Sequence, residues 1–143
     1  MSAPLAIVRS LDHLVLTCSS VSATVDWYVQ YLGMKAEEFD TRSGPRVALK
    51  FGTQKINLHQ KGKEFEPKAT TALPGTADLC FLVPDETRLE SVIEGFRKNS
   101  VEVLEGGEVV DRTGALGKLR SIYVRDPDGN LIELSKYGGY EVA

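Results

Sequence analysis

Apolar positions recur with a helical period in two stretches of the chain. Between residues 21 and 32 they fall three or four residues apart, which places them on one face of a helix. Gly33 follows as a typical left-handed C-cap for this helix. Residues 89 to 96 show the same period after a capping-box sequence, Thr87 to Glu90. We therefore predict two helices, one in each half of the chain.

Short apolar and β-branched runs predict strands around both helices. In the first half these runs are 11–17, 46–51 and 55–59, of which the last two form a hairpin. In the second half they are 76–83, 101–104, 119–125 and 130–135. The polar stretch 61–74 and the glycine-rich stretch 105–118 are predicted to be mostly loop. The predicted order is β-α-β-β-β, twice.

The two halves also align residue by residue. The segment that begins at His13 matches the one that begins at Asp78, 65 residues later, and Ile56-Asn57-Leu58 matches Ile132-Glu133-Leu134 with an offset of 76. An insertion of 11 residues in the glycine-rich stretch accounts for the difference between the two offsets. A tandem repeat explains the chain better than two unrelated halves.

Polar side chains occupy equivalent positions on four of the predicted strands. Because strand residues alternate between faces, the apolar residues on either side of each polar one must face the helix. The opposite face then carries His13, Asn57, Asp78 and Glu133, with His59 one step farther along. If the sheet curls, these side chains gather on its concave face.

Nitrogen and oxygen donors of this kind suit a divalent cation such as Mn, Fe, Ni, Zn or Mg. Each residue also has an ordinary structural explanation: a hydrogen-bonded histidine, a strand-end aspartate, or the solvated side of an alternating strand for Glu133. Both histidines of the chain, however, fall on the same predicted face. That coincidence, together with the repeat, favours a shared site.

Composition and charge narrow the classes of partner. The chain has 143 residues, the size of one domain, and a net charge of −3, which argues against a nucleic-acid-binding protein. No apolar run has the length of a membrane span, and the first ten residues lack the pattern of a secretory signal. Two cysteines exclude a disulfide scaffold. We expect a cytoplasmic protein with reduced thiols and a small-molecule substrate.

Several segments together resemble the vicinal oxygen chelate superfamily, which includes glyoxalase I, bleomycin-resistance proteins and ring-cleaving dioxygenases. They are residues 11–16, 31–34 and 125–134. Further segments resemble the glyoxalase domain-containing protein 5-like, virulence-associated group: 54–59, 65–69, 74–80, 112–115 and 121–123. The resemblance implies an α+β fold of two βαβββ modules with a cupped mixed sheet. It covers one domain over about 9–137, with modules at about 9–68 and 75–137.

The resemblance also implies a divalent metal (Ni, Zn, Mn or Fe) and a homodimer. His13 and Glu133 match the usual first and last ligands of the superfamily. Asn57 stands where glyoxalase I has a carboxylate or Gln, and Asp78 stands where many members have a second histidine. With these departures, His59 becomes the candidate for the missing ligand.

The chemistry implied is that of a glyoxalase-like lyase or isomerase acting on vicinal oxygens through an enediolate. Glu133 or Asp78 would transfer the proton, with His59 as an alternative base. Asn57, Arg46, Arg112 and Tyr123 would contact the substrate, the two arginines through an anionic group. Two alternatives remain: a metal-dependent dioxygenase, isomerase or cyclase of the same fold, and a bleomycin-resistance-type binding protein without turnover.

Overall fold

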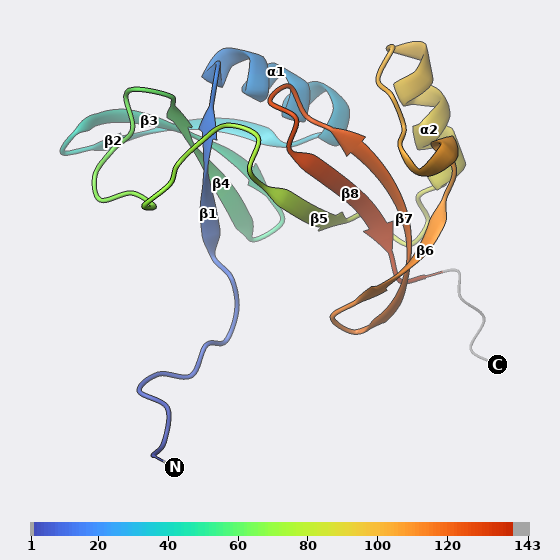
Figure 1. Ribbon diagram of the computed structural model, residues 1–143, viewed down its shortest axis with the longest axis horizontal. Helices are drawn as coiled ribbons and strands as arrows, with labels where there is room; N and C mark the ends of the chain where they lie inside the picture. Colours follow the sequence, from blue (N-terminus) through green and yellow to red (C-terminus); the bar gives the residue numbers. More distant parts are fainter. Residues whose placement is uncertain (1, 139–143) are drawn as a thin grey trace. The chain divides into compact units, whose positions relative to one another are not determined.

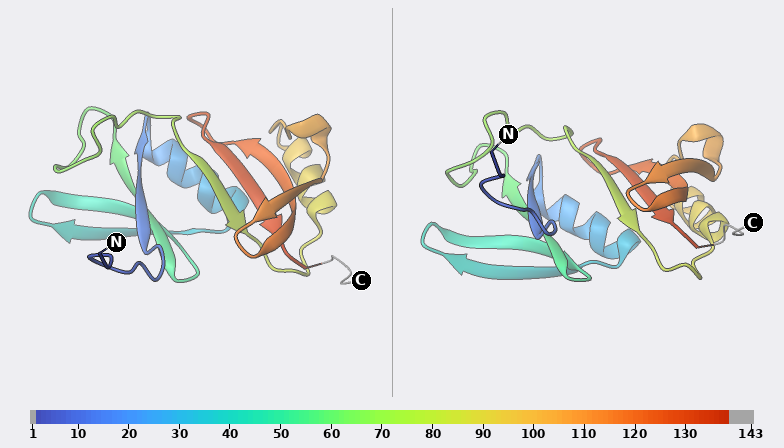
Figure 2. Two further views of the ribbon diagram at one scale, coloured as in Figure 1. Left: turned by 60° about the horizontal axis from the view of Figure 1, so that its bottom comes forward. Right: turned by 90° about the horizontal axis from the view of Figure 1, so that it is seen from below.

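A computed structural model describes residues 2–138 of the chain. The chain divides into two compact units, of which unit 1 ends at Leu73 and unit 2 begins at Pro74. Each unit consists of one strand, one α-helix and three further strands (Figures 1 and 2). The predicted α+β fold of two βαβββ modules is confirmed.

Unit 1 folds as a four-stranded mixed sheet with one helix. Its elements are β1 (His13–Cys18), α1 (Val21–Leu32), β2 (Lys35–Thr41), β3 (Gly44–Phe51) and β4 (Gln54–Gln60). The strand order is β1-β4-β3-β2, and only the β1–β4 pair is parallel. The Ser20 hydroxyl accepts a hydrogen bond from the Ala23 N–H and so caps α1 at its start, while Gly33 ends the helix at φ 67°.

The core of unit 1 lies between α1 and the sheet. Leu16 on β1, and Ile56 and Leu58 on β4, are almost completely buried. Tyr28 is also fully buried, on α1. Strand alternation therefore leaves His13, Asn57 and His59 on the other face of the sheet, as the sequence predicts.

Unit 2 repeats this arrangement. Its elements are β5 (Asp78–Leu82), α2 (Leu89–Lys98), a short 3-10 helix η1 (Glu105–Gly107), β6 (Val110–Gly114), β7 (Gly117–Arg125) and β8 (Leu131–Lys136). The strand order is β5-β8-β7-β6, and only the β5–β8 pair is parallel. Leu89, Ile93 and Phe96 form the buried face of α2, and Ile122 and Ile132 are fully buried on β7 and β8.

Three details of the predicted elements are wrong. The strand predicted at residues 101–104 is absent, and the stretch predicted to be loop contains β6 and the start of β7. The buried Val103 accounts for the apolar signal, because it packs in the core without joining a ladder. The capping box predicted at Thr87 does not form, because α2 begins at Leu89 after Arg88 and no side chain caps it.

The turn between β7 and β8 holds unit 2 together through side-chain hydrogen bonds. The Asp126 carboxylate accepts from the N–H groups of Asp128 and Asn130, at 2.9 and 3.0 Å, and from the Asn130 amide at 2.8 Å. Asn130 in turn accepts from the Ala77 N–H at 2.9 Å, directly before β5. The Asp-Pro-Asp-Gly-Asn sequence therefore has a structural role.

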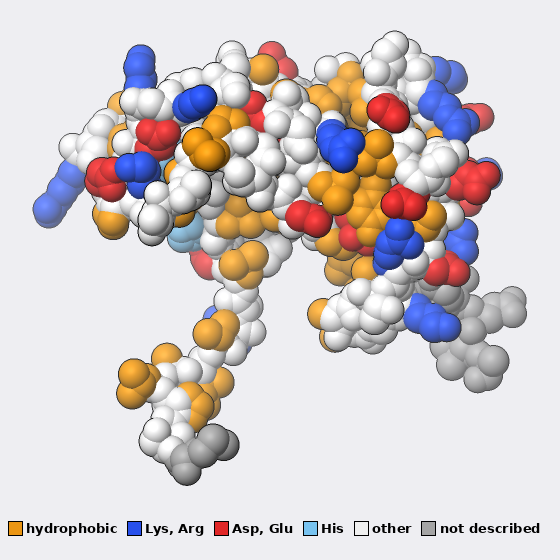
Figure 3. All heavy atoms as spheres, viewed as in Figure 1, with side chains coloured by type: hydrophobic (Ala, Val, Ile, Leu, Met, Phe, Trp, Pro, Cys, Tyr) orange, Lys and Arg blue, Asp and Glu red, His pale blue; other side chains and the backbone are white. Residues whose placement is uncertain are grey.

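The N-terminal segment before β1 exposes apolar side chains. Figure 3 shows hydrophobic side chains along the N-terminal segment, where Leu5, Ile7 and Val8 are exposed. Within residues 2–138, no helix is both long enough and apolar enough to cross a membrane.

Candidate functional site

Glu133 lies on β8, a central strand of the unit 2 sheet, on the face that does not carry the core. It pairs with Tyr123 on β7 and with Cys80 on β5. Its apolar neighbours Ile132 and Leu134 are buried and point to the opposite face. Strand alternation thus fixes the direction of the Glu133 side chain.

Two buried serines orient the Glu133 carboxylate. The Ser121 hydroxyl donates to Oε2 at 2.6 Å, and the Ser135 hydroxyl donates to the same oxygen at 3.1 Å. The two hydroxyl oxygens lie 2.6 Å from each other, and neither serine is exposed to solvent. Hydrogen bonds from rigid, buried donors hold a charged acceptor in one orientation.

Arg112 and Tyr123 supply the charge and the proton donor beside Glu133. Arg112 Nε donates to the Tyr123 hydroxyl at 3.0 Å, and the guanidinium lies 5.2 Å from the centre of the Tyr123 ring. Burial and a hydrogen bond with Glu133 raise the pKa of Tyr123, and the bond from Arg112 opposes them. Tyr123 is therefore a neutral phenol at physiological pH. Arg112, expected on a loop, lies on β6.

These side chains line a cavity of about 400 Å³ in unit 2. Its polar wall contains Glu133, Arg112, Tyr123, Cys80 and Thr113, while its other lining residues are Leu82, Gly114, Ala115, Leu119 and Tyr137. The Tyr137 hydroxyl accepts from the Leu116 N–H at 3.0 Å and so fixes the β6–β7 turn at the cavity. A concave site with few convergent polar groups in an apolar lining is typical of small-molecule binding.

Cys80 joins the same hydrogen-bond network. Its thiol donates to the Ser135 hydroxyl at 3.2 Å. Burial raises the pKa of the Cys80 thiol, and the negative charges of Glu133 and Asp78 add to this, whereas the bond with Ser135 opposes it. Cys80 is thus a protonated thiol at neutral pH and a weak nucleophile.

Unit 1 contains a second group of candidate residues. Asn57 and His59 lie on β4 and are 5% and 4% exposed, and Arg46 lies on β3. Burial and the charge of Arg46 lower the pKa of His59, against a smaller opposite effect of Glu64. His59 is therefore neutral at physiological pH.

His13 lies at the start of β1, away from His59. It pairs with Lys55, whereas His59 pairs with Thr17, so the two histidines are four positions apart, about 13 Å along the strands. His13 Nδ1 lies 2.7 Å from a carboxylate oxygen of Asp12. A carboxylate partner on one ring nitrogen is common in histidines that bind a metal through the other nitrogen.

His13 in unit 1 and Glu133 in unit 2 each have donor chemistry that suits a ligand of a divalent cation. Within either unit, however, the described residues include no three His, Cys, Asp or Glu side chains grouped to hold a metal ion. Asp78 lies on the same face as Glu133 but two positions before Cys80 along β5, and it is exposed. A complete ligand set thus does not form inside a single unit.

Sequence reasoning missed the residues that organise the Glu133 site. Ser121 and Ser135 could not be identified as candidates from the sequence, because buried serines are common. The distance between them depends on the register of the strands, which the sequence does not give. The available signal was alternation, since Ser121 and Tyr123 on β7 share a face with Glu133 and Ser135 on β8. Arg112 and Tyr123 were candidates from the sequence, and the structure brings them together.

Two curated proteins are similar to the chain along most of its length. It is 53% identical over 130 residues to the glyoxalase domain-containing protein RDO1 of Mycosarcoma maydis, covering 91% of this chain and 69% of that protein. It is 49% identical over 131 residues to the virulence protein STM3117 of Salmonella typhimurium, covering 92% and 86%.

Solved structures agree with this relationship. The crystal structure of the Salmonella virulence protein matches with a TM-score of 0.82 at 47% identity, over 92% of this chain and 99% of that one. The fold is also that of lactoylglutathione lyase from Agrobacterium tumefaciens, with a TM-score of 0.62 at 20% identity, over 95% and 96% of the two chains.

A family model provides the assignment. The model of the Glyoxalase/Bleomycin resistance protein/Dioxygenase superfamily matches residues 10–134, which include both βαβββ units. With the two-unit fold and the relatives above, this match establishes that the chain belongs to the Glyoxalase/Bleomycin resistance protein/Dioxygenase superfamily.

Proposed function

We propose that the protein is a glyoxalase-like lyase or isomerase that moves a proton on a small substrate with vicinal oxygens, bound in the unit 2 cavity. One observation carries the proposal. The Glu133 carboxylate is held by two buried serine hydroxyls at the wall of a cavity that also contains Arg112 and Tyr123. An oriented carboxylate beside a fixed cation suits proton abstraction next to a carbonyl.

In this reaction Glu133 removes a proton from the carbon next to the substrate carbonyl. The electron pair moves onto the carbonyl oxygen, and an enediolate forms. Arg112 stabilises the negative charge that develops on oxygen, and the neutral Tyr123 phenol donates a hydrogen bond to it. Glu133 then returns the proton to the former carbonyl carbon, while the substrate's hydroxyl proton passes to the former carbonyl oxygen, so the hydroxycarbonyl is isomerised without an external oxidant or reductant.

A divalent cation, where bound, would polarise both substrate oxygens as a Lewis acid. In unit 2, Glu133 is an oriented carboxylate that would serve as a ligand. In unit 1, the His13 ring has a carboxylate partner on Nδ1, an arrangement typical of metal-binding histidines.

The first test follows proton exchange directly. Wild-type protein is supplied with each metal in turn (Ni, Zn, Mn or Fe) and with the methylglyoxal–glutathione hemithioacetal, and product formation and solvent deuterium incorporation are followed by NMR. A second assay uses dihydroxyacetone, a hydroxycarbonyl compound without a thiol. We expect exchange in at least one assay, and its loss in Glu133→Gln.

A matched control separates catalysis from general damage. Glu102→Gln neutralises an exposed carboxylate of unit 2 outside the cavity and should leave exchange unchanged. Metal content is measured in the wild type, His13→Gln and Glu133→Gln. Exchange that survives Glu133→Gln at the wild-type rate would contradict the proposed role of Glu133.

Binding without turnover is a second candidate function. It is favoured by the largely apolar remainder of the cavity lining, formed by Leu82, Ala115, Leu119 and Tyr137. Saturable binding of a substrate analogue in the cavity without any deuterium exchange, under every metal condition, would support this function over the first.

A further inference from the structure

Of the four buried polar atoms of unit 1 that have no hydrogen-bond partner among the described residues, one is Thr24 Oγ1 on α1, and the other three lie on two adjacent strands. These three are Arg46 Nε on β3, and Asn57 Oδ1 and His59 Nε2 on β4. Buried polar atoms in proteins are almost always paired, because an unpaired one loses its hydration without compensation. Three such atoms on two adjacent strands therefore indicate a missing partner that comes from outside the chain.

The strand register brings the three side chains together. Ala48 pairs with Asn57 and Val47 with Leu58, so Arg46 and His59 are the next residues of the two strands, just beyond the last pair of the ladder. Arg46, Asn57 and His59 all point to the face of the sheet that does not contact α1. Ala48, between them, has the smallest side chain that could occupy that position other than glycine.

In unit 2 the polar side chains at the equivalent positions form hydrogen bonds with one another. By ladder position, Arg46, Asn57 and His59 correspond to Ser121, Glu133 and Ser135. In unit 2 both serine hydroxyls donate to the Glu133 carboxylate, at 2.6 and 3.1 Å. In unit 1 Arg46 Nε, Asn57 Oδ1 and His59 Nε2 make no hydrogen bonds with one another. The equivalent positions of the two units therefore differ: the side chains of unit 2 are hydrogen-bonded to each other, and those of unit 1 are not.

The surroundings of the three residues are apolar on one side and basic on the other. Phe65, in the segment after β4, lies 4.2 Å from the Arg46 guanidinium (measured to the ring centroid) and 5.4 Å from the His59 ring. Among the described residues no ion pair of Arg46 with a carboxylate is present within 4.0 Å. Glu64 is the carboxylate that acts on His59, and its own oxygen accepts from the Gly62 N–H at 2.9 Å.

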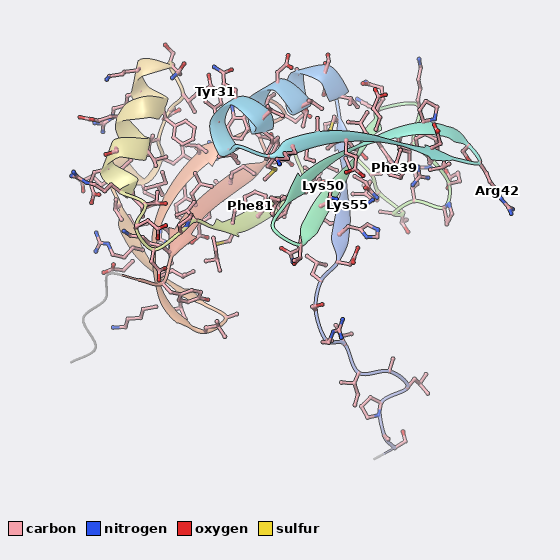
Figure 4. The ribbon with its side chains drawn as sticks, turned by 180° about the vertical axis from the view of Figure 1, so that it is seen from behind. Tyr31, Phe39, Arg42, Lys50, Lys55 and Phe81 are labelled. Carbon is pink, nitrogen blue, oxygen red and sulfur yellow. The ribbon has the colours of Figure 1, made fainter. Side chains whose placement is uncertain are left out.

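Two lysines add positive charge to this face. Lys50 and Lys55 pair across β3 and β4 (Figure 4) and, by alternation, share the face with Arg46 and Asn57. Lys50 forms an ion pair with Glu37 at 3.4 Å, and Lys55 lies 4.2 Å from the centre of the Phe39 ring. The net charge of the face favours an anionic ligand.

We propose that Arg46, Asn57 and His59 form a binding site for a small hydroxycarboxylate. The three unpaired atoms require a ligand with both a hydrogen-bond acceptor and a hydrogen-bond donor. Arg46 Nε–H is a donor and requires an acceptor such as a carboxylate oxygen, whereas Asn57 Oδ1 is an acceptor and requires a donor such as a hydroxyl. His59 Nε2 takes either role according to its tautomer. An α-hydroxy acid carries both groups on adjacent carbons.

This inference concerns unit 1 alone and does not rest on the proposed function. Lactate is the probe, because it is the smallest chiral α-hydroxy acid. Propionate lacks its hydroxyl, and propane-1,2-diol lacks its carboxylate. Binding is measured by calorimetry and by the NMR signals of Arg46 Nε–H and the His59 ring in the full chain.

We expect lactate to bind saturably and to shift the Arg46 and His59 signals. Propionate should bind more weakly, and the diol should not bind. Arg46→Gln should weaken lactate binding by about tenfold or more, since it removes a charge-assisted hydrogen bond. Arg42→Gln removes an exposed arginine from the β2–β3 turn (Figure 4) and should leave binding unchanged.

Three results would overturn the inference. The first is the absence of saturable lactate binding by wild-type protein. The second is equal binding of lactate, propionate and the diol, a comparison that needs no variant and so does not depend on whether Arg46→Gln folds. The third is a set of shifts confined to Arg112, Tyr123 and their neighbours, which would assign the ligand to the unit 2 cavity instead.

Discussion

The Ser121 hydroxyl donates a hydrogen bond of 2.6 Å to Glu133 Oε2, from a side chain that is fully buried. The donor lies on β7 and the acceptor on β8, so the antiparallel ladder between these strands sets their separation. Because both strands are central in the sheet, the carboxylate cannot turn without breaking this bond. Ser121 is therefore a positioning residue for the proposed proton transfer.

Replacing Ser121 tests this role. In Ser121→Ala the carboxylate loses its shortest bond, and we expect the free energy of unfolding to fall by about 1–3 kcal/mol. We also expect kcat of the proposed reaction to fall by roughly tenfold or more with a smaller change in KM, because orientation matters most in the transition state. Ser121→Thr retains the hydroxyl and should recover part of kcat. An equal loss in both variants would contradict the role.

His59 should make the stability of the fold depend on pH. Burial, and then Arg46, lower its pKa from the ordinary 6.5. As the pH falls below 6.5, the unfolded chain takes up a proton on His59 before the folded chain does. We therefore expect the free energy of unfolding to decrease from about pH 6.5 down to the lower folded pKa and to show no contribution from His59 above that range.

Urea unfolding of wild type and His59→Gln across about pH 5 to 7.5 measures this effect. Since carboxylates are common to both proteins, the difference between the two curves isolates His59. The wild-type curve should fall more steeply as the pH decreases. Parallel curves would show that His59 has the same pKa in the folded and unfolded chains.

Cys80 should react slowly with thiol reagents although it is exposed. Burial of its sulfur environment and the charges of Glu133 and Asp78 raise its pKa above the ordinary 9.0. Glu133→Gln removes one of these charges, so the thiolate fraction and the alkylation rate by iodoacetamide near pH 8 should rise a few-fold. Cys18 is 1% exposed and should not react in the folded protein. Glu102→Gln is the control, and an identical rate in both variants would exclude an electrostatic effect of Glu133.

The β7–β8 turn should be a strong determinant of stability. Asp126 accepts three hydrogen bonds, from two N–H groups and the Asn130 amide, and is 6% exposed. Asp126→Ala leaves these donors unpaired, and we expect a loss of about 1–3 kcal/mol in the free energy of unfolding. Glu102→Ala, on an exposed position, should cost much less. Similar urea midpoints for the two variants would argue against this role of the turn.

The polar edge strands show where the sequence pattern gave no signal. β2 and β6 lie at sheet edges, and all of their side chains are exposed or half-buried, so neither has apolar alternation. Their assignment comes from ladder pairing with β3 and β7. The apolar run 101–104 led to the opposite error, a predicted strand that does not form, because Val103 is buried outside any strand.

The sequence by itself determined the repeat, both helices and the face on which each polar strand residue lies. These features depend on periods of 2 and 3.6 residues and on repetition, which are local properties of a chain. Those periods place Glu133, Asn57 and His59 on the sheet faces opposite the core. They do not predict which side chains contact one another.

Only the tertiary structure decided which side chains contact one another. Ser121, Ser135 and Glu133 form one network, and Arg46 lies beside His59, because strands distant in sequence pair in a particular register. Register depends on the burial of a whole sheet face and on turn geometry, and a shift of one residue would reverse every side chain. The same register closes the hydrogen bonds in unit 2 and leaves three polar atoms of unit 1 without partners.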